Sequence, residues 1–462
     1  MERPVAPLRV AVVGSGPAGF YAAGQLLRAL PGAEVEMFDR LPTPWGLVRA
    51  GVAPDHPNIK AVTRVFEKTA SQPGFRFHGN VTVGRDVSHA ELAAHCHAVL
   101  YAVGAPADRR LGIPGEELPG SLAATAFVGW YNGHPDYADL DPDLSCRRAV
   151  VVGNGNVALD VARMLVLGRE ALGVTDVADH ALELLGRSAV EEVVVLGRRG
   201  PAQAAFTDPE LEELGALADV DLIVRPEELA LDPASAAWLD SDAASETARR
   251  NVALLRELAG RVPQGRRKRI ELRFLASPLE IVGDGRVEGV RISRNALDAQ
   301  QRAQPIGWEE TLAAGLVLRS VGYRGEPVPG LPFDERRATI ANERGRVVDP
   351  ASGAPVAGAY TAGWIKRGPS GIIGTNKKCA QETVTELLAD HAAGLLPTPQ
   401  AGAQELLDLL HARNPDVVDY AGWELIDAHE REAGAPAGRP RVKVVRQERF
   451  LQLAGQRKSG ED

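Results

Sequence analysis

Residues 10–39 decide the fold, and their sequence is VAVVGSGPAGFYAAGQLLRALPGAEVEMFD. The segment Leu8–Val13 at its start is short, apolar and rich in valine, which predicts a buried parallel strand. The segment Phe20–Leu30 is apolar and rich in alanine, with no proline before Pro31, which predicts a helix. The loop between them, residues 14–19, reads GSGPAG. A strand, a glycine loop and a helix in this order predict a dinucleotide-binding unit.

Each glycine of this loop has its own task in such a unit. Gly14 permits the tight turn, Gly16 lets the backbone approach a pyrophosphate, and Gly19 lets the helix pack close to the strand. A second predicted strand, Glu34–Phe38, ends at Asp39, 25 positions after Gly14, where a carboxylate bonds a ribose 2′-hydroxyl. A glycine motif alone would carry little weight, because ordinary α/β proteins also contain glycine-rich turns. The whole unit favours a nucleotide site.

The composition is that of an ordinary globular protein, and it narrows the possible partners. The 462 residues predict two or three domains, and 45% of them are hydrophobic and 24% charged. The formal net charge of −9 argues against nucleic acid as the main partner. The three cysteines, Cys96, Cys146 and Cys379, are far apart and form no C-x-x-C motif. They indicate a reducing compartment and exclude a local dithiol relay.

The sequence also carries no signal for export or membrane insertion. The N-terminal residues 1–9 lack the charged and then apolar pattern of a signal peptide. No stretch stays apolar for the roughly 18 residues that a membrane helix needs. We therefore expect a cytoplasmic protein.

A second copy of the opening pattern follows in the middle of the chain. The apolar segment Arg148–Val152 predicts a strand, residues 153–158 form the loop GNGNVA, and Leu159–Leu167 predicts a helix. Ala158 replaces the third glycine, a substitution that is common where a second nucleotide site binds NADP. Two such units in one chain favour a protein that passes electrons between two nucleotides.

The second unit differs from the first at the ribose position. Its next predicted strand, Glu192–Leu196, leads into Gly197, Arg198, Arg199 and Gly200, so two arginines stand where the first unit has a carboxylate. Guanidinium groups bind a 2′-phosphate through planar, charge-assisted hydrogen bonds, whereas a carboxylate repels it. An exposed basic pair at a strand end is the alternative. Its place in a second glycine fingerprint favours NADP over NAD.

Other segments carry weaker predictions. The proline- and glycine-rich residues 41–57 predict an ordered loop without regular structure, followed by a helix over Ile59–Ala70. Residues 235–260 predict a solvated helical insertion, and Ile281–Ile292 predicts a hairpin. The basic run Arg266–Arg269 is either a docking surface or simply a solvated face. The glycine-rich residues 363–376 precede a predicted helix over Cys379–Ala392, so a third glycine loop meets a helix N-terminus.

Together these motifs resemble the adrenodoxin-reductase-type ferredoxin–NADP reductases, including their actinobacterial relatives. The segments that carry the resemblance are residues 14–20, 45–49, 51–56, 153–162, 195–206 and 363–376. The resemblance implies an α/β fold with two Rossmann-like dinucleotide-binding domains in a glutathione-reductase-like arrangement. The NADP domain, residues 108–324, is then inserted into an FAD domain formed by residues 1–107 and 325–462.

The resemblance also implies the cofactor contacts. It places FAD contacts at Gly14, Gly16, Ala18, Gly19, Asp39, Leu47, Val83, Trp364, Gly371, Ile372 and Ile373. It places NADP contacts at Asn154, Gly155, Asn156, Val157, Arg198, Arg199, Glu210 and Gly371. The family usually has glutamate where this chain has Asp39, so we expect the shorter side chain to reach the ribose directly or through a water molecule. No metal site is expected.

Three side chains are candidates for a role in the reaction itself. His56 and Glu210 are the titratable pair that we expect near the flavin, where they would tune proton uptake or the position of the nicotinamide. A loop histidine and a first-turn helix acid explain them equally well. Trp364 is expected where the nicotinamide meets the flavin, as a gate, although packing alone also explains a tryptophan there.

The resemblance implies an enzyme that takes a hydride from NADPH onto FAD and passes single electrons to a ferredoxin. The iron–sulfur centre must belong to that partner, because this chain has no cysteine cluster. We expect an acidic ferredoxin held by basic residues, and the ferredoxin could supply cytochromes P450 or an assembly pathway. Three alternatives stay open: an NADPH-dependent flavin reductase (diaphorase) for quinones or other small acceptors, a flavin monooxygenase, and a non-catalytic NADP-binding protein.

Overall fold

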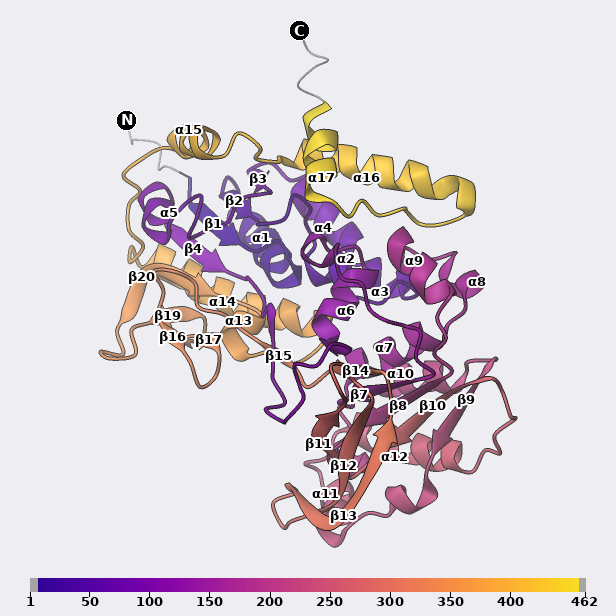
Figure 1. Cartoon of the computed structure of the whole chain (residues 1–462). Helices are drawn as coiled ribbons and strands as arrows, with labels where there is room; N and C mark the ends of the chain where they lie inside the picture. Colours follow the sequence, from indigo (N-terminus) through magenta and orange to yellow (C-terminus); the bar gives the residue numbers. More distant parts are fainter. Residues whose placement is uncertain (1–6, 457–462) are drawn as a thin grey trace, which may run out of the picture. The chain divides into compact units, whose positions relative to one another are not determined.

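The computed structural model describes residues 7–456, so six of the N-terminal residues used in the signal-peptide argument lie outside the described range. The chain forms two compact units, each with its own sheet (Figure 1). The first unit comprises residues 1–107 and 323–462, and the second comprises residues 108–322. Within residues 7–456, no helix combines the length and the apolar character that crossing a membrane requires.

The first unit is built on a seven-stranded sheet in the order β18-β19-β20-β4-β1-β2-β3. Five neighbouring strands, from β20 to β3, are parallel, and β19 and β18 continue the sheet in antiparallel fashion. The bounds are β1 Arg9–Val13, β2 Glu34–Phe38, β3 Phe75–His78, β4 Ala98–Tyr101, β18 Asn342–Glu343, β19 Arg346–Val348 and β20 Pro355–Thr361. The two faces of β1 contribute to two different core clusters, so this strand is covered on both sides.

Two helices that begin at glycine loops pack against each other in this unit. These are α1, Pro17–Ala29, and α14, Ile373–Ala392. Both begin earlier than the sequence predicts. In α1, Pro17 occupies the first turn, where its missing N–H costs nothing, so the helix starts inside the glycine loop. Phe20 of α1 stacks on Phe66, with the ring centroids 5.0 Å apart, and both side chains are buried.

The prediction of an irregular loop over residues 41–57 and one helix over Ile59–Ala70 is wrong in detail. Three short helices occupy this region: α2, Leu47–Ala50, α3, Pro57–Lys60, and α4, Thr63–Ala70. Pro57 is the first residue of α3, and the helical hydrogen-bond pattern is interrupted before α4 begins at Thr63. The strand β3 ends at His78, and Asn80, which adopts a left-handed conformation with φ of 60°, turns the chain shortly after it.

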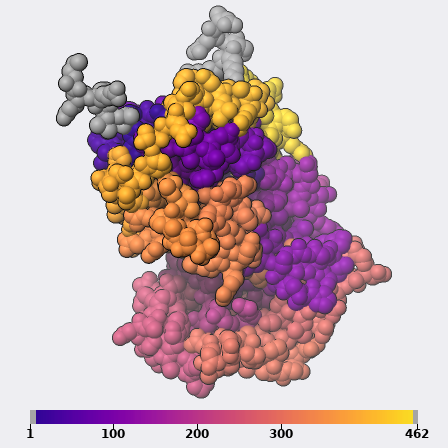
Figure 2. All heavy atoms as spheres, turned by 90° about the vertical axis from the view of Figure 1, so that its left-hand side faces the viewer, coloured from indigo at the N-terminus to yellow at the C-terminus, as the bar shows by residue number. Residues whose placement is uncertain are grey.

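The C-terminal part of the first unit consists of helices. They are α15, Ala403–Arg413, α16, Tyr420–Gly434, and α17, Gln447–Ala454. Figure 2 shows α15, in gold, on the surface beside the purple segment that contains α5, His89–His95, and Arg413 joins the two through an ion pair of 2.6 Å with Glu91. Between Leu395 and residue 456, the structure describes no strand.

The second unit is built on a six-stranded, fully parallel sheet in the order β6-β14-β7-β8-β10-β9. The bounds are β6 Ser121–Ala123, β7 Arg148–Val152, β8 Glu192–Leu196, β9 Val220–Val224, β10 Lys268–Arg273 and β14 Leu316–Arg319. The predicted strands at β7 and β8 are confirmed residue for residue. The helix α7, Asn156–Val166, follows β7 and again starts earlier than predicted, inside the glycine loop.

A separate antiparallel sheet carries the predicted hairpin. It consists of β11, Ala276–Val282, β12, Gly289–Leu297, and β13, Ala303–Ala313. Val282 pairs with Gly289, so residues 283–288 connect the two strands of the hairpin. The predicted helical insertion forms α11, Pro233–Asp240, and α12, Glu246–Ala259. It is not merely solvated, because α12 buries Val252, Leu255 and Leu258.

The basic run Arg266–Arg269 is paired within its own unit. Arg266 lies 3.5 Å from Asp219, Arg267 lies 3.0 Å from Glu191, and Arg269 lies 2.7 Å from Glu192. The amine of Lys268 donates to the carbonyl of Val166 at 3.0 Å. These internal partners favour a structural role for the run over a docking surface.

Candidate cofactor sites

The first glycine loop is tightly packed on two sides and open on the third. Gly14 has φ of 103°, and a Cβ there would lie 2.4 Å from the carbonyl oxygen of Ala102. A Cβ at Gly19 would lie 2.0 Å from the carbonyl oxygen of Gly14. A Cβ at Gly16 would meet no atom within 4 Å. The backbone at Gly16 is therefore accessible to a ligand, whereas Gly14 and Gly19 are required for the chain's own packing.

The N-terminus of α1 can accommodate a negatively charged group. Its N-cap residue, Gly16, supplies no side-chain cap, and its first turn contains no acidic residue. The first backbone N–H groups of a helix have no partner within the helix, and the helix dipole adds a partial positive charge at that end. This donor set fits the pyrophosphate of a dinucleotide.

Asp39 anchors the glycine loop. Its Oδ2 accepts from the backbone N–H of Ser15 at 2.9 Å and from the Ser15 hydroxyl at 2.5 Å, and its Oδ1 accepts from the N–H of Leu41 at 2.9 Å. A carboxylate oxygen has more than one lone-pair site, so this anchoring is compatible with a further bond to a ribose hydroxyl. The sequence did not reveal the bonds to Ser15, which explain how a carboxylate with a short arm holds the loop.

The segment after Asp39 folds back onto the glycine loop. The N–H of Trp45 donates to the carbonyl of Ser15 at 2.9 Å, and a Cβ at Gly46 would lie 3.0 Å from the Cα of Gly16. Leu47 follows and is 41% exposed, which leaves an apolar surface beside the loop. The other predicted contact of this region, Val83, is half-buried and packs on the neighbouring core cluster.

The glycine-rich residues 363–376 approach α1 from the other side. A Cβ at Gly363 would lie 2.7 Å from the Cβ of Ala18, so the two segments are in direct contact. The N–H of Gly363 donates to the Sγ of Cys379 at 3.2 Å. A lone cysteine carries no spacing signal, so no role for Cys379 can be predicted from the sequence. In the structure it fixes the start of this segment.

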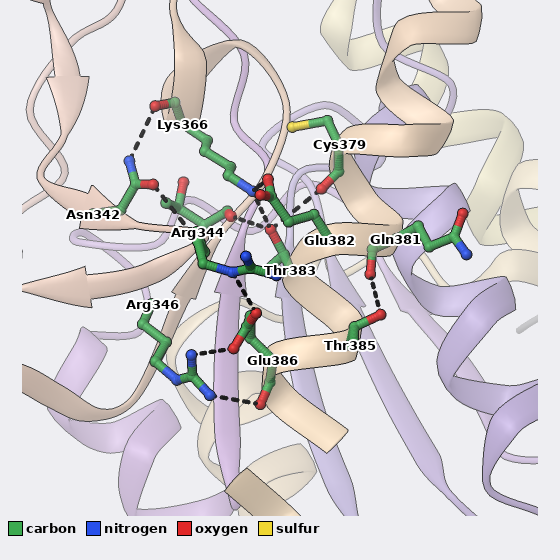
Figure 3. A network of polar contacts seen from close by, with 12 residues as sticks. Asn342, Arg344, Arg346, Lys366, Cys379, Gln381, Glu382, Thr383, Thr385 and Glu386 are labelled. Carbon is green, nitrogen blue, oxygen red and sulfur yellow. Dashed lines mark hydrogen bonds and ion pairs between the residues drawn. The ribbon is translucent and has the colours of Figure 1, made fainter. Parts of the chain in front are cut away.

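A buried lysine ties the same segment to α14 (Figure 3). The helix α13, Trp364–Arg367, carries Lys366, whose amine donates to Glu382 at 2.6 Å and to the Thr383 hydroxyl at 3.0 Å. Asn342 donates to the carbonyl of Lys366 at 3.0 Å. These bonds hold α13, and with it Trp364, whose ring centroid lies 5.0 Å from that of Tyr323.

The N-terminus of α14 resembles that of α1. Its N-cap residue, Ile372, supplies no side-chain cap, its first turn has no acidic residue, and a Cβ at Gly374 would meet no atom within 4 Å. The guanidinium of Arg367 shapes the preceding loop, because it donates to the carbonyl of Ser370 at 2.5 Å and to the Asn376 side chain at 2.9 Å. The predicted contacts Gly371, Ile372 and Ile373 all lie at this helix start.

The second unit repeats the arrangement of the first loop. A Cβ at Gly153 would lie 2.1 Å from the carbonyl oxygen of Ser320, whereas a Cβ at Gly155 would meet no atom within 4 Å. Gly155 is the uncapped N-cap residue of α7, whose first turn also lacks an acidic residue. Asn156 accepts from the N–H of Thr207 at 2.8 Å, so its side chain fixes the segment after β8. Val157 is half-buried against the core.

Two arginines without charge partners lie beside this second loop. The N–H of Gly153 donates to the carbonyl of Leu196, the last residue of β8, so the loop and the end of β8 are adjacent. Arg198 and Arg199 are exposed, and among residues 7–456 neither guanidinium has a hydrogen bond or ion pair. Partial burial and then the charge of Arg198 lower the pKa of Arg199. Two neighbouring positive charges without counterions are suited to bind an anion.

The titratable candidates lie in different units, and each is buried. His56 is the N-cap residue of α3 in the first unit. Glu210 lies in the first turn of α10, Asp208–Gly215, in the second unit, as the sequence predicts. The guanidinium of Arg163 lies 3.6 Å from Glu210 and donates to Asp160 at 2.7 Å. Sequence reasoning does not find Arg163, because it lies on a buried helix face and its contact with Glu210 comes from another helix.

The fold and these sites define a class of protein, the two-nucleotide α/β oxidoreductases. Residues 8–199 match the family model described as pyridine nucleotide-disulphide oxidoreductase. The chain is 50% identical over 463 residues to the NADPH-ferredoxin reductase FprA of Mycobacterium tuberculosis, covering 97% of this chain and 99% of the relative. It is 41% identical to the mitochondrial NADPH:adrenodoxin oxidoreductase of Arabidopsis thaliana, covering 97% of this chain and 95% of the relative.

A solved structure supports the same assignment. The structure of Mycobacterium tuberculosis FprA in complex with NADPH matches with a TM-score of 0.90 and 49% sequence identity, covering 97% of this chain and 99% of that chain. The chain belongs to the adrenodoxin-reductase-type NADPH–ferredoxin reductase family.

Proposed function

We propose that this chain is an FAD-dependent NADPH–ferredoxin reductase, with FAD held by the first unit and NADP(H) by the second. The observation that carries the proposal is the difference between two otherwise similar loops. Each loop lies between a buried strand and a helix start without a side-chain cap. At the end of the next strand, the first unit carries Asp39, whereas the second unit carries the unpaired Arg198 and Arg199. A carboxylate suits a ribose hydroxyl, and a guanidinium pair suits a 2′-phosphate. The chain therefore offers two different nucleotide sites.

The residues of the first unit fit FAD. The open backbone at Gly16 and the uncapped start of α1 suit the pyrophosphate, and Asp39 suits the ribose. The exposed side chains of Leu47 and Ile372 offer apolar contacts for the flavin. Gly371, Ile372 and Ile373 lie at the uncapped start of α14, whose N–H groups suit an electron-rich ring. When bound, FAD and NADPH supply hydride transfer and one-electron release. The contribution of the chain is to position the two rings and to exclude water.

Trp364 is proposed as the side chain that gates the nicotinamide position. We expect Trp364→Ala to slow flavin reduction by NADPH about fivefold, because a stacked aromatic contact contributes about 1 kcal/mol. Rapid mixing with NADPH measures this rate. Trp308→Ala is the control, since Trp308 is 45% exposed on β13 of the second unit. Unchanged NADPH affinity and turnover in Trp364→Ala would remove the proposed role.

His56 and Glu210 are proposed to tune proton uptake or nicotinamide position. Both are buried, which suits groups that act away from bulk water. We expect His56→Ala to lower the rate of hydride or electron transfer at least about tenfold, as for other positioned acid–base groups. His411→Ala, an exposed histidine of α15, should leave both rates unchanged. A His56→Ala variant with wild-type rates would leave only a structural role for His56.

The electron acceptor is proposed to be an acidic ferredoxin-type iron–sulfur protein, which could in turn supply cytochromes P450. The names of the similar proteins support the ferredoxin, and the chain offers no cysteine cluster that could hold an iron–sulfur centre itself. A small acceptor such as a quinone is the second candidate. We also propose a cytoplasmic location, which the three free cysteines favour.

Two measurements on the purified protein test this function. Release of the bound flavin should yield FAD, and NADPH-dependent reduction of cytochrome c should require added ferredoxin. Reduction of a quinone that is faster than reduction of ferredoxin would favour the small-acceptor alternative. A protein that binds no flavin would contradict the proposal.

A further inference from the structure

The C-terminal helices reach the loop that covers the first glycine motif. The side chain of Arg49, in α2, is buried and forms a two-point ion pair with Glu430 of α16, with distances of 2.8 Å and 2.5 Å. The guanidinium also lies over the rings of Trp423 and Phe450, at 5.4 Å and 5.8 Å from their centroids. These two rings belong to α16 and α17, which lie side by side in Figure 1.

Glu430 is the centre of this cluster. It is completely buried, and it also accepts from Arg441 at 3.1 Å and from the N–H of Val444 at 2.8 Å. Burial alone would raise the pKa of Glu430, but the charges and hydrogen bonds of Arg49 and Arg441 lower it below its ordinary value. Lys443 donates to the backbone carbonyl of Arg49 at 3.0 Å. The side chain and the backbone of Arg49 are thus both held by the C-terminal segment.

The same contacts constrain Trp45, which adopts an unusual backbone. Its φ is 84°, a left-handed value that is costly for a bulky residue and persists only where the surroundings enforce it. Trp45 is buried, its ring meets Trp423 edge to face at 4.9 Å, and Arg441 lies over it at 5.9 Å. On its other side, Trp45 bonds to Ser15 of the glycine loop. Residues 45–49 are therefore clamped between the glycine loop and α16.

We propose that Glu430 is a positioning residue for the flavin site: through Arg49 it holds residues 45–47 against the first glycine loop, so that the C-terminal segment is part of the FAD-binding apparatus. The inference rests on the proposed function, since it assumes that this loop binds FAD. Without the ion pair, the surroundings no longer enforce the strained backbone at Trp45, and Gly46 is no longer held against Gly16. The site then has to be ordered by the cofactor, which lowers affinity.

The test compares two buried carboxylates of the same unit in Glu430→Gln and Glu36→Gln. Glu36 is also buried and bonds to Arg76 and His78, but within residues 7–456 no hydrogen bond or ion pair links these three residues to residues 45–49. Both variants should be less stable to heat. At a temperature where both are folded, we expect Glu430→Gln to lose FAD at least about tenfold faster and to show an altered visible circular dichroism of the flavin, because breaking a buried pair leaves an unpaired charge. Glu36→Gln should keep wild-type values.

The milder variant Arg49→Lys keeps the test informative if Glu430→Gln does not fold, and it should also release FAD faster. Glu430→Asp should restore part of the FAD retention. The inference would be overturned if folded Glu430→Gln or Arg49→Lys released FAD at the rate of the wild-type protein. It would also be overturned if Glu36→Gln and Glu430→Gln released FAD at equal rates. Failure of the proposed function is distinct from all of these results, because the wild-type protein would then bind no FAD.

Discussion

Replacing both Arg198 and Arg199 with glutamine is expected to raise the KM for NADPH about 100-fold and to leave the KM for NADH within about threefold. Each charge-assisted bond to a 2′-phosphate is worth about 1.5–3 kcal/mol, and a loss of about 3 kcal/mol in total is a factor of about 100. The phosphate is present only in NADPH. Neither guanidinium has another partner in the described chain, so their removal should not disturb the fold. Steady-state kinetics with the two nucleotides measure the effect.

The matched control for this experiment is Arg187→Gln. Arg187 is an exposed arginine at the end of α9, Asp179–Gly186, in the same unit, and it is remote in sequence from both glycine loops. It should change neither KM. An Arg198/Arg199 variant that still prefers NADPH as strongly as the wild type would contradict the placement of the 2′-phosphate.

Gly16→Ala and Gly155→Ala are expected to disable one nucleotide site each. Both glycines are N-cap residues with ordinary backbone angles, and a Cβ at either position meets no atom of the chain within 4 Å. The free energy of unfolding of the nucleotide-free protein should therefore fall by no more than about 1 kcal/mol, the usual effect of alanine at an N-cap. The added methyl group instead occupies the space where the phosphates would approach the backbone.

The two variants should differ in which nucleotide they lose. Gly16→Ala should yield a protein that lacks FAD but still binds NADP(H). Gly155→Ala should yield a yellow protein with the flavin binding of the wild type, whose flavin is reduced by NADPH at least about 100-fold more slowly. Flavin content and isothermal titration with NADP measure both. If Gly155→Ala loses FAD, or Gly16→Ala keeps it, the assignment of the loops is wrong.

The parts of the fold that follow local chemistry could be predicted from the sequence. The strands Glu34–Phe38, Arg148–Val152 and Glu192–Leu196 were predicted with their observed bounds, because buried parallel strands are continuous apolar runs between breakers. The starts of α1 and α7 were placed too late, since the sequence does not show where a glycine loop becomes helical. The break between α3 and α4 was missed because nothing but tertiary packing decides it.

The parts that depend on distant contacts could not be predicted. Arg49 and Glu430 are 381 positions apart, and no spacing rule links a loop arginine to a helix glutamate. The same holds for Cys379, which meets Gly363 only after α13 and α14 are in place. The pairing of Arg266–Arg269 with acidic residues was equally hidden, so the run looked free in the sequence. Motifs with fixed spacing reveal the nucleotide loops, and the structure reveals the residues that hold those loops in place.

The most direct test of the account is anaerobic rapid mixing of the flavin-loaded protein with NADPH, and then with an oxidised ferredoxin. We predict that NADPH rapidly bleaches the visible flavin absorbance, that NADH does so more slowly, and that the ferredoxin is then reduced. If NADPH does not bleach the flavin, the proposed hydride transfer from NADPH to FAD is contradicted. Bleaching by NADPH without reduction of the ferredoxin would contradict the ferredoxin reductase and leave an NADPH-dependent flavoenzyme for a small acceptor.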